Sequence, residues 1–277
     1  MTLDVDELRR LRALAELTAE EAGDLLLSLA PGDLAVRTKT SSSDPVSEAD
    51  DASERLIVDR LLEARPDDGI LGEEEADNRV GTSGFRWVID PLDGTVNYLY
   101  GIPQWCVSIA LEDPDGTPVV GVVHDPNRRE TFGAFVGGGA SVNEASVREH
   151  ELRVSQPRSL DTTLLTTGFA YDPDVRAAQA DFFAGILGRV RDARRFGAAA
   201  LDLAWVAAGR IDVYLENSLQ RWDWAAGRLL VTEAGGVAHD LELDLGLAAP
   251  VDGLIAGGPA AVRSLLDELN HHVTVLA

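Results

Sequence analysis

Between residues 85 and 136 the chain breaks into short apolar runs, and this pattern limits its fold more than any other feature. The runs occupy residues 87–89, 106–111, 119–123 and 131–136, and glycine, proline, asparagine and aspartate separate them. Short apolar runs between turn-forming residues predict strands of an antiparallel or mixed sheet. Because helical patterns precede and follow this region, the sequence predicts layers of helix and sheet.

Apolar residues recur at helical spacing on both sides of these strands. The spacing predicts one or two amphipathic helices over residues 4–29, before Pro31-Gly32, and another helix over 51–64. The polar, serine-rich segment 38–47 between them predicts a loop. In the second half, the predicted strands are 163–167, 212–215 and 254–256, and the predicted helices are 177–190, 198–208, 223–234 and 259–269.

No repeat and no long linker divides the chain. We therefore expect a single domain over residues 1–277, built from two fused halves. The half formed by residues 1–150 carries most of the acidic motifs described below, and the half formed by residues 151–277 carries Asp223.

Acidic residues dominate the charge of the protein. The net charge is −23, from 47 aspartates and glutamates against 24 lysines and arginines. This balance repels nucleic acid and anionic membranes, so neither is an expected partner. A phosphate substrate would also be repelled unless local positive charge, most simply metal ions, offsets the acids. The acidic surface is equally compatible with salt adaptation.

The single cysteine and the absence of long apolar segments bear on location. Cys106 alone cannot form an intramolecular disulfide, which fits a reducing cytosol. No run of about 18 apolar residues and no signal-peptide core is present, so the expectation is a cytoplasmic protein without a membrane span.

The strongest chemical signal is the segment 90–97, directly after the apolar run 87–89. Asp90 and Asp93 stand around a proline, and Gly94 follows. The proline stiffens the turn, so both carboxylates can point to one place, and the glycine lets the backbone approach a ligand closely. Oxygen ligands of this kind suit Mg²⁺ or Mn²⁺ better than zinc. An ordinary aspartate-containing turn is the competing interpretation.

Two further acidic clusters stand beside apolar segments. Glu73 and its acidic neighbours follow Ile70-Leu71, and Asp223 lies between two tryptophans at the start of a predicted helix. A solvated loop and a helix N-cap are the ordinary explanations of these clusters. However, an unpaired carboxylate between indole rings is costly, and a bound cation removes that cost.

Together these segments resemble the inositol monophosphatase family over nearly the whole chain. The matching motifs, in family order, are Lys39, 45–50, 72–74, 90–97, 101–103, 107–111, 197–202, Glu216 and 222–227. The resemblance implies an α+β, layered αβαβα sandwich with mixed or antiparallel sheets (the sugar phosphatase fold), dependence on Mg²⁺ with Mn²⁺ as a substitute, inhibition by lithium, and a homodimer.

The resemblance also implies roles for individual residues, of which metal binding is the central one. Two to three ions per site are expected, and their ligands would be Glu73, Asp90, the Leu92 carbonyl, Asp93 and Asp223. Asp50, Glu73 and Thr95 would be catalytic and orient the attacking water, while Gly94 and Thr95 would bind the phosphate. The substrate-binding residues would be Asp93, Gly197, Ala198, Ala199, Glu216 and Asp223.

Four positions depart from the family pattern. They are Tyr98, Trp105, Ala198 and Arg221, where the family usually has phenylalanine, a smaller side chain, a hydroxyl residue, and proline or cysteine. None is an expected metal ligand, so these departures bear on substrate preference rather than on the chemistry.

The implied reaction is hydrolysis of the phosphate monoester of a small polyol, above all myo-inositol 1-phosphate, by a metal-activated water. Histidinol phosphate, fructose 1,6-bisphosphate and a phosphoadenosine nucleotide remain rival substrates. A protein of another class also remains open: a non-catalytic, Mg²⁺-binding regulatory partner of the transcription machinery. Other phosphatase and nucleotide-hydrolysing motifs are absent from the sequence.

Overall fold

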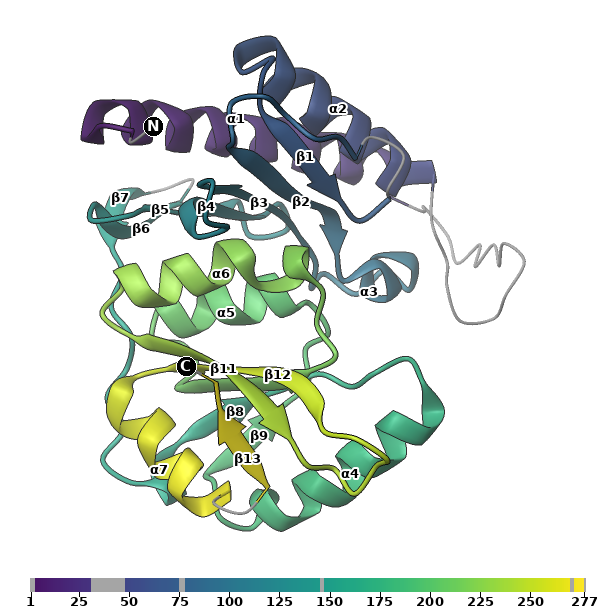
Figure 1. The fold of residues 1–277 in the computed structure, drawn as a ribbon, viewed down its shortest axis with the longest axis vertical. Helices are drawn as coiled ribbons and strands as arrows, with labels where there is room; N and C mark the ends of the chain where they lie inside the picture. The colour runs from purple at the N-terminus through teal and green to yellow at the C-terminus, as the bar shows by residue number, and fades with distance from the viewer. Residues whose placement is uncertain (1–2, 31–47, 75–77, 145–146, 270–271, 277) are drawn as a thin grey trace.

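The computed structural model describes residues 3–30, 48–74, 78–144, 147–269 and 272–276. The chain forms five layers, which alternate between helices and sheets (Figure 1). The polar loop predicted at 38–47, with the Lys39 motif and residues 45–47 of the 45–50 motif, lies outside the described residues. The predicted αβαβα sandwich is confirmed.

The first sheet has seven strands that follow one another in chain order. β1 pairs with β2 in parallel, and every other neighbouring pair is antiparallel. The strands are β1 (Gly69–Gly72), β2 (Arg86–Asp93), β3 (Cys106–Glu112), β4 (Pro118–Asp125), β5 (Glu130–Phe135), β6 (Gly139–Glu144) and β7 (Val147–Glu151). The four predicted strands of this region are thereby confirmed, as β2 to β5.

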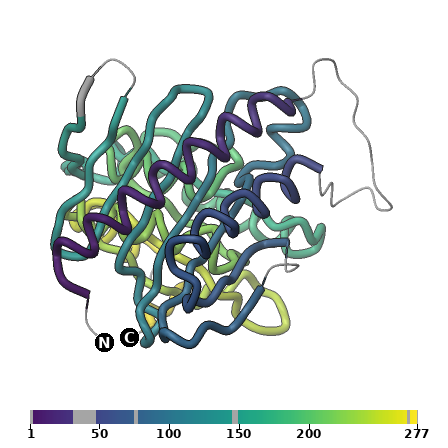
Figure 2. The backbone as a smooth tube through the Cα atoms, turned by 90° about the horizontal axis from the view of Figure 1, so that it is seen from above, coloured from purple at the N-terminus to yellow at the C-terminus, as the bar shows by residue number. Residues whose placement is uncertain are grey.

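Two helices cover the outer face of the first sheet. They are α1 (Val5–Leu29) and α2 (Glu48–Ala64), which lie side by side and pack on β4 and β2 respectively (Figure 2). Asp4 begins α1 as its N-cap, because its side chain accepts the Glu7 N–H at 2.8 Å. The buried face of α1 is the apolar stripe that the helical spacing predicted, from Leu8 to Leu26.

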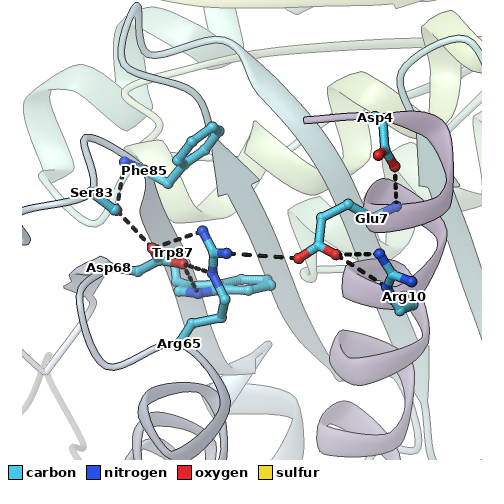
Figure 3. A network of polar contacts seen from close by, with 8 residues as sticks. All are labelled: Asp4, Glu7, Arg10, Arg65, Asp68, Ser83, Phe85 and Trp87. Carbon is cyan, nitrogen blue, oxygen red and sulfur yellow. Dashed lines mark hydrogen bonds and ion pairs between the residues drawn. The ribbon is translucent and has the colours of Figure 1, made fainter. Parts of the chain in front are cut away.

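A polar network joins this helical layer to the sheet (Figure 3). Asp68 is 1% exposed and accepts hydrogen bonds from Arg65 at 2.9 Å, Ser83 at 2.7 Å and the Trp87 indole at 3.1 Å. Arg65 also lies 3.7 Å from Glu7 on α1. A buried carboxylate needs such partners, so Asp68 ties the end of α2 to the start of β2.

The second sheet contains six strands in the order β13-β11-β12-β10-β8-β9. Its strands are β8 (Leu164–Thr166), β9 (Asp192–Arg194), β10 (Val213–Asn217), β11 (Val237–Leu243), β12 (Val251–Gly257) and β13 (Val273–Val275). One face shares an apolar core with α4 (Pro173–Leu187) and α7 (Pro259–Leu269). A 3₁₀ helix, η1 (Leu160–Thr162), precedes β8.

The helix α4 begins four residues earlier than the sequence predicted and ends three residues earlier. Asp172 caps it by accepting the Asp174 and Val175 N–H groups, and Pro173 takes the first helical position. Proline is well suited to that position because its missing N–H would have no helical partner. The predicted start at residue 177 followed the apolar pattern alone and missed this cap.

The middle layer consists of α5 (Ala199–Ala207) and α6 (Arg221–Glu233), between the two sheets (Figure 1). Both were predicted as small-residue helices, and the small side chains permit close packing. A Cβ on Gly121 of β4 would lie 2.8 Å from the Ala226 carbonyl oxygen of α6. The backbone of α6 therefore packs directly against the backbone of β4. No helix of the described residues is long and apolar enough to cross a membrane.

This close approach predicts opposite effects for two glycine-to-alanine substitutions. We expect Gly121→Ala to lower the free energy of unfolding by about 1–3 kcal/mol, because backbone atoms of α6 must move. Gly185→Ala on α4, where an added Cβ meets nothing within 4 Å, should raise it by up to about 1 kcal/mol. Urea unfolding of both variants measures these free energies. Equal changes in the two variants would contradict the close backbone packing of α6 on β4.

Candidate functional site

The centre of the candidate site is the end of β2. The pairing of β2 with β3 shifts between Asp90 and Asp93, which marks a β-bulge. Within it, the Leu92 N–H donates to Asp90 Oδ1 at 3.0 Å. The two aspartates are 2% and 8% exposed. The bulge therefore turns two carboxylates into the interior at one strand end.

A tight turn follows, at the predicted phosphate-binding residues. Gly94 has φ +92°, and a Cβ there would lie 3.0 Å from the Gln104 carbonyl oxygen and 3.2 Å from the Ala198 Cβ. Thr95 begins α3 (Thr95–Leu99), and its hydroxyl donates to the Leu92 carbonyl at 3.0 Å. The turn needs glycine for both its φ angle and its close contacts. A carbonyl oxygen has a second lone pair, so Leu92 retains an acceptor site.

Asp93 connects this turn to the middle layer. Its two carboxylate oxygens accept the Ala199 N–H at 3.2 Å and the Ala200 N–H at 2.7 Å, at the start of α5. The Cys106 thiol lies 3.6 Å from Oδ2 and donates to it. Free N–H groups at a helix start favour negative charge, so α5 holds the Asp93 carboxylate in place.

Two acids from the second half of the chain border the same region. Asp223 is the third residue of α6, and its carboxylate accepts the Gln220 N–H at 2.6 Å. Gln220, not Asp223, is the N-cap residue of α6. Glu216 on β10 accepts the Tyr214 hydroxyl at 2.8 Å. Its carboxylate also occupies the space that a Cβ on Gly168 would take.

The two remaining predicted acids come from the first helical layer and the loop after β1. Asp50 on α2 is 3% exposed, whereas Glu73 is at the surface. The charge of Asp50 acts on Glu73 and on Asp90, and Glu73 also shares a hydrogen bond with Asp90. Thus Asp50, Glu73 and Asp90 lie together, although they are up to forty residues apart in the sequence.

The acids raise each other's pKa. The surrounding protein atoms, which replace water, are the largest cause for Glu73, Asp90, Asp93 and Asp223, even though one side of Glu73 faces solvent. Repulsion from neighbouring carboxylates adds to this effect for Glu73, Asp90 and Asp223. The pKa of Glu73 rises from 4.5 to about 8, with Asp50 as the strongest charged neighbour. The pKa of Asp93 rises to about 6 although its N–H partners oppose the shift, and burial raises the pKa values of Asp90 and Asp223 well above the ordinary value.

This donor chemistry fits a hard divalent cation. All candidate ligands are oxygens, which Mg²⁺ prefers, and a nearby cation would offset the mutual repulsion. Among the described residues, however, no three acidic, histidine or cysteine side chains already stand in a compact metal-binding group. Part of the reason is that Asp93 and Asp223 direct oxygens to backbone N–H groups. Each carboxylate keeps further lone pairs for a cation.

The structure places the predicted substrate residues around the same turn. Gly197 has φ +89° and lies beside the Asn97 amide, which donates to the Gln104 and Phe196 carbonyls at 2.7 Å. Ala198 is buried against Gly94, and the Ala199 N–H is committed to Asp93. These backbone contacts connect the residues after β9 to the end of β2.

Sequence analysis missed three residues near the site. Asp202 is 1% exposed, and its Oδ2 accepts the Thr166 hydroxyl at 2.7 Å. The charge of Arg195 acts on Asp202 and Glu216, and the exposed Tyr171 interacts electrostatically with Glu73. Asp202 stood in a family motif, but Arg195 and Tyr171 had no distinguishing local pattern.

Three of the family departures have structural partners outside the proposed metal ligands. The Tyr98 hydroxyl donates to the Leu26 carbonyl of α1 at 2.8 Å, and its ring meets Trp105 edge to face at 5.1 Å. Arg221 contacts the buried Glu112 at 2.5 Å and stacks over Trp224. Tyr98, Trp105 and Arg221 therefore contribute to packing between layers.

Comparison with known proteins agrees with this fold and this acidic site. The inositol monophosphatase family matches residues 7–274. An inositol-1-monophosphatase of Mycobacterium bovis is 45% identical over 249 residues, which cover 85% of each chain. The Nus factor SuhB of Escherichia coli K12 is 37% identical over 267 residues, covering 94% of this chain and 96% of the relative.

The solved structure of Mycobacterium tuberculosis SuhB has the same architecture. It aligns with a TM-score of 0.79 at 39% identity, covering 94% of this chain and 96% of that chain. The fold and the buried acids are those of a class of phosphatases that generally depend on metal ions. The chain belongs to the inositol monophosphatase family.

The raised pKa values predict how the metal-free protein responds to pH. Glu73 and Glu216 have ordinary pKa values of 4.5, which the fold raises to about 8 and about 7. The folded state therefore holds more protons than the unfolded state, and the free energy of unfolding falls as pH rises through this window. We expect the Tm of chelator-treated protein to drop between about pH 6.5 and 8, and Mg²⁺ to restore it.

The pH range of this test lies above the range in which His124 affects stability, and His124 acts in the opposite direction. His124 is buried, which lowers its pKa from 6.5 to about 4, so its effect on stability is confined to lower pH, where stability rises with pH. Glu73→Gln is the matched variant, and its Tm should vary less with pH. Identical pH profiles for the wild type and Glu73→Gln would contradict the coupling.

Proposed function

We propose that the protein hydrolyses the phosphate monoester of a small polyol, above all myo-inositol 1-phosphate, with Mg²⁺ as its cofactor. The observation that carries this proposal is the gathering of Asp90, Asp93, Glu73 and Asp223, whose pKa values burial and mutual repulsion raise. Such a cluster is stable as carboxylates only beside cations. Membership of the inositol monophosphatase family supports a phosphatase.

The proposed ligands of two to three ions are Glu73, Asp90, Asp93, Asp223 and the Leu92 carbonyl, with Mn²⁺ as a substitute for Mg²⁺. When bound, such ions lower the pKa of water and offset charge on the attacking and leaving oxygens. This chemistry suits phosphate monoesters, whose uncatalysed hydrolysis is among the slowest known reactions.

The residues of the chain would position the reactants. Backbone N–H groups of Gly94 and Thr95, at the start of α3, are proposed to bind the phosphate. Asp50 and Glu73 lie in electrostatic contact and would accept a proton from the attacking water, which the Thr95 hydroxyl orients. The water oxygen would then form a bond to phosphorus as the ester bond breaks, and the leaving polyol oxygen would take up a proton from solvent.

The substrate side is proposed to consist of Glu216, Asp93, Asp223 and the segment 197–199. Glu216 is oriented by Tyr214, and a carboxylate accepts hydrogen bonds from polyol hydroxyls. The M. bovis relative is named an inositol-1-monophosphatase, which favours inositol over histidinol phosphate or fructose 1,6-bisphosphate. We also propose a homodimer, as the family resemblance implies, and a cytoplasmic location, which the single cysteine favours.

A second candidate function follows from another relative. The E. coli relative is named a Nus factor, so a regulatory protein that binds Mg²⁺ without catalysis is the rival proposal. Release of phosphate from inositol 1-phosphate, with and without Mg²⁺, separates the two. No Mg²⁺-dependent release from this ester or from histidinol phosphate would favour the regulatory protein.

Loss of one acid should abolish most activity while keeping the fold. We expect Asp93→Asn to reduce kcat/KM by about 100-fold or more, because one anionic ligand is lost. The asparagine oxygen can still accept an N–H from α5, so circular dichroism should be unchanged. Asp6→Asn, an exposed acid on α1, is the control. Near-normal activity of Asp93→Asn would remove Asp93 from the metal ligands.

Lithium provides a test of the proposed metal sites. We expect millimolar Li⁺ to inhibit phosphate release at saturating Mg²⁺, because a small hard cation competes for the same oxygen ligands. The measurement is the rate at increasing Li⁺, with K⁺ at equal ionic strength as the control. Indifference to Li⁺ would indicate a site that differs from the proposed one.

A further inference from the structure

Arg195 is an exposed cation that follows β9 at the edge of the acidic site. Its side chain makes no hydrogen bond or ion pair with any of the residues that the structure describes, although its charge acts on Asp202 and Glu216. Its neighbour Arg194, by contrast, pairs with Asp192 at 2.7 Å. Other arginines of the described residues, such as Arg158 and Arg263, also lack a side-chain partner, but the charge of Arg195 acts on the acids Asp202 and Glu216, and a cation at this place suits an anionic ligand.

The position of Arg195 is defined by contacts with the segment that follows it. Its guanidinium lies over Gly197, with Cζ 3.4 Å from the point that a Cβ would occupy. Gly197 precedes Ala198, which packs against Gly94 of the proposed phosphate turn. Arg195 is therefore three residues from the alanine that packs against that turn. It lies on the side of Glu216 and Asp202, and its charge acts on both acids.

Tyr171 presents a second donor at this edge. Its side chain is 70% exposed, and it interacts electrostatically with Arg195 and with the acids Glu73, Asp93 and Asp223. No described residue accepts a hydrogen bond from its hydroxyl. The Thr167 N–H donates to the Arg194 carbonyl at 3.0 Å, so the segments that lead to Tyr171 and to Arg195 lie side by side and bring a phenol hydroxyl and a guanidinium to the same rim.

The backbone around Tyr171 is held firmly on α4. The Ala170 N–H donates to Gln179 Oε1 at 2.8 Å, and Gln179 is fully buried. Arg176 Nη1 donates to the Ala170 and Tyr171 carbonyls, at 3.1 Å each. Gln179 also donates to Asn217, the neighbour of Glu216, at 2.6 Å. Tyr171 is therefore fixed relative to the strand that carries Glu216.

We propose that Arg195 and Tyr171 form an anion subsite at the rim of the candidate site, which binds a second phosphate or carboxylate group of the substrate. This inference rests on the proposed function. Guanidinium groups bind such anions through paired charge-assisted hydrogen bonds, and a phenol hydroxyl adds a third donor. Among the described residues, the Glu216 carboxylate accepts from the Tyr214 hydroxyl and makes no hydrogen bond with either donor.

The subsite predicts a preference for phosphate esters with two anionic groups. The probes are matched pairs that differ by one phosphate: inositol 1-phosphate with inositol 1,4-bisphosphate, and fructose 1-phosphate with fructose 1,6-bisphosphate. For at least one pair, Arg195→Gln should raise KM for the bisphosphate by about 10- to 100-fold, the loss expected for a hydrogen bond to a charged group. Its kcat, and both constants for the monophosphate, should change by less than about threefold.

The second variant and the control separate this role from a structural one. Tyr171→Phe should raise KM for the same bisphosphate by about three- to tenfold, because only one neutral donor is lost. Arg194→Gln, next in sequence but paired with Asp192, should leave the preference unchanged. Size-exclusion chromatography of each variant records its oligomeric state.

Three results would overturn the subsite. One is an equal change, or none, for the mono- and bisphosphate of both pairs in Arg195→Gln. Another is a wild-type enzyme that hydrolyses monophosphates but rejects bisphosphates. A third is dissociation of an oligomer in Arg195→Gln, with equal losses on all esters, which would assign the arginine to a contact between copies. A wild type inactive on every ester would instead refute the proposed function, and the subsite with it.

Discussion

The hydrogen bonds between Asp93 and the start of α5 hold the candidate site together. They join the end of a strand in the first sheet to a helix of the middle layer, across 106 residues of sequence. The other contacts of the region follow from this junction: Gly94 lies against Ala198, and the Asn97 amide reaches the Phe196 carbonyl. If Asp93 moved, the turn that is proposed to bind phosphate would lose its contacts with the segment before α5.

The same junction concentrates negative charge. Asp90 and Asp93 are buried at the strand end, and acids from α2, the loop after β1 and α6 act on them. Removing carboxylates from water without a counter-charge is costly. Other buried acids, such as Asp68 and Glu112, have arginine partners. A group of acids whose pKa values are raised in this way is characteristic of a site built for a ligand rather than for stability.

The sequence predicted the fold well where its patterns were long or strongly apolar. The first helix and strands β2 to β5 agree with their apolar spacing. Six strands were not predicted, namely β1, β6, β7, β9, β11 and β13. β9 and β13 have three residues each and are largely exposed, so they depend on pairing with a neighbour rather than on burial. In β6 and β11, polar residues interrupt the apolar ones, so neither contains an apolar run. The start of α4 was misplaced because a cap, not hydrophobicity, determines it.

The candidate site was predictable to the extent that its residues occur in motifs. The motif around Asp90 named the carboxylates at the end of β2, but it did not reveal that α5 holds Asp93. Arg195 and Tyr171 could not be found in this way. One is an arginine among several arginines and the other an isolated tyrosine, and only the fold brings them to the same rim.

The contact between Gly168 and Glu216 restricts how this protein can change over evolutionary time. The Glu216 carboxylate fills the space of a Cβ at position 168, so a larger residue there would displace the end of this side chain. Shortening or removing that acid first would open the position, whereas the reverse order passes through an intermediate in which the carboxylate has left its present place. Effects of neighbouring substitutions are often non-additive in this way. Descendants with a different preferred ester are thus expected to have altered residue 216 before residue 168.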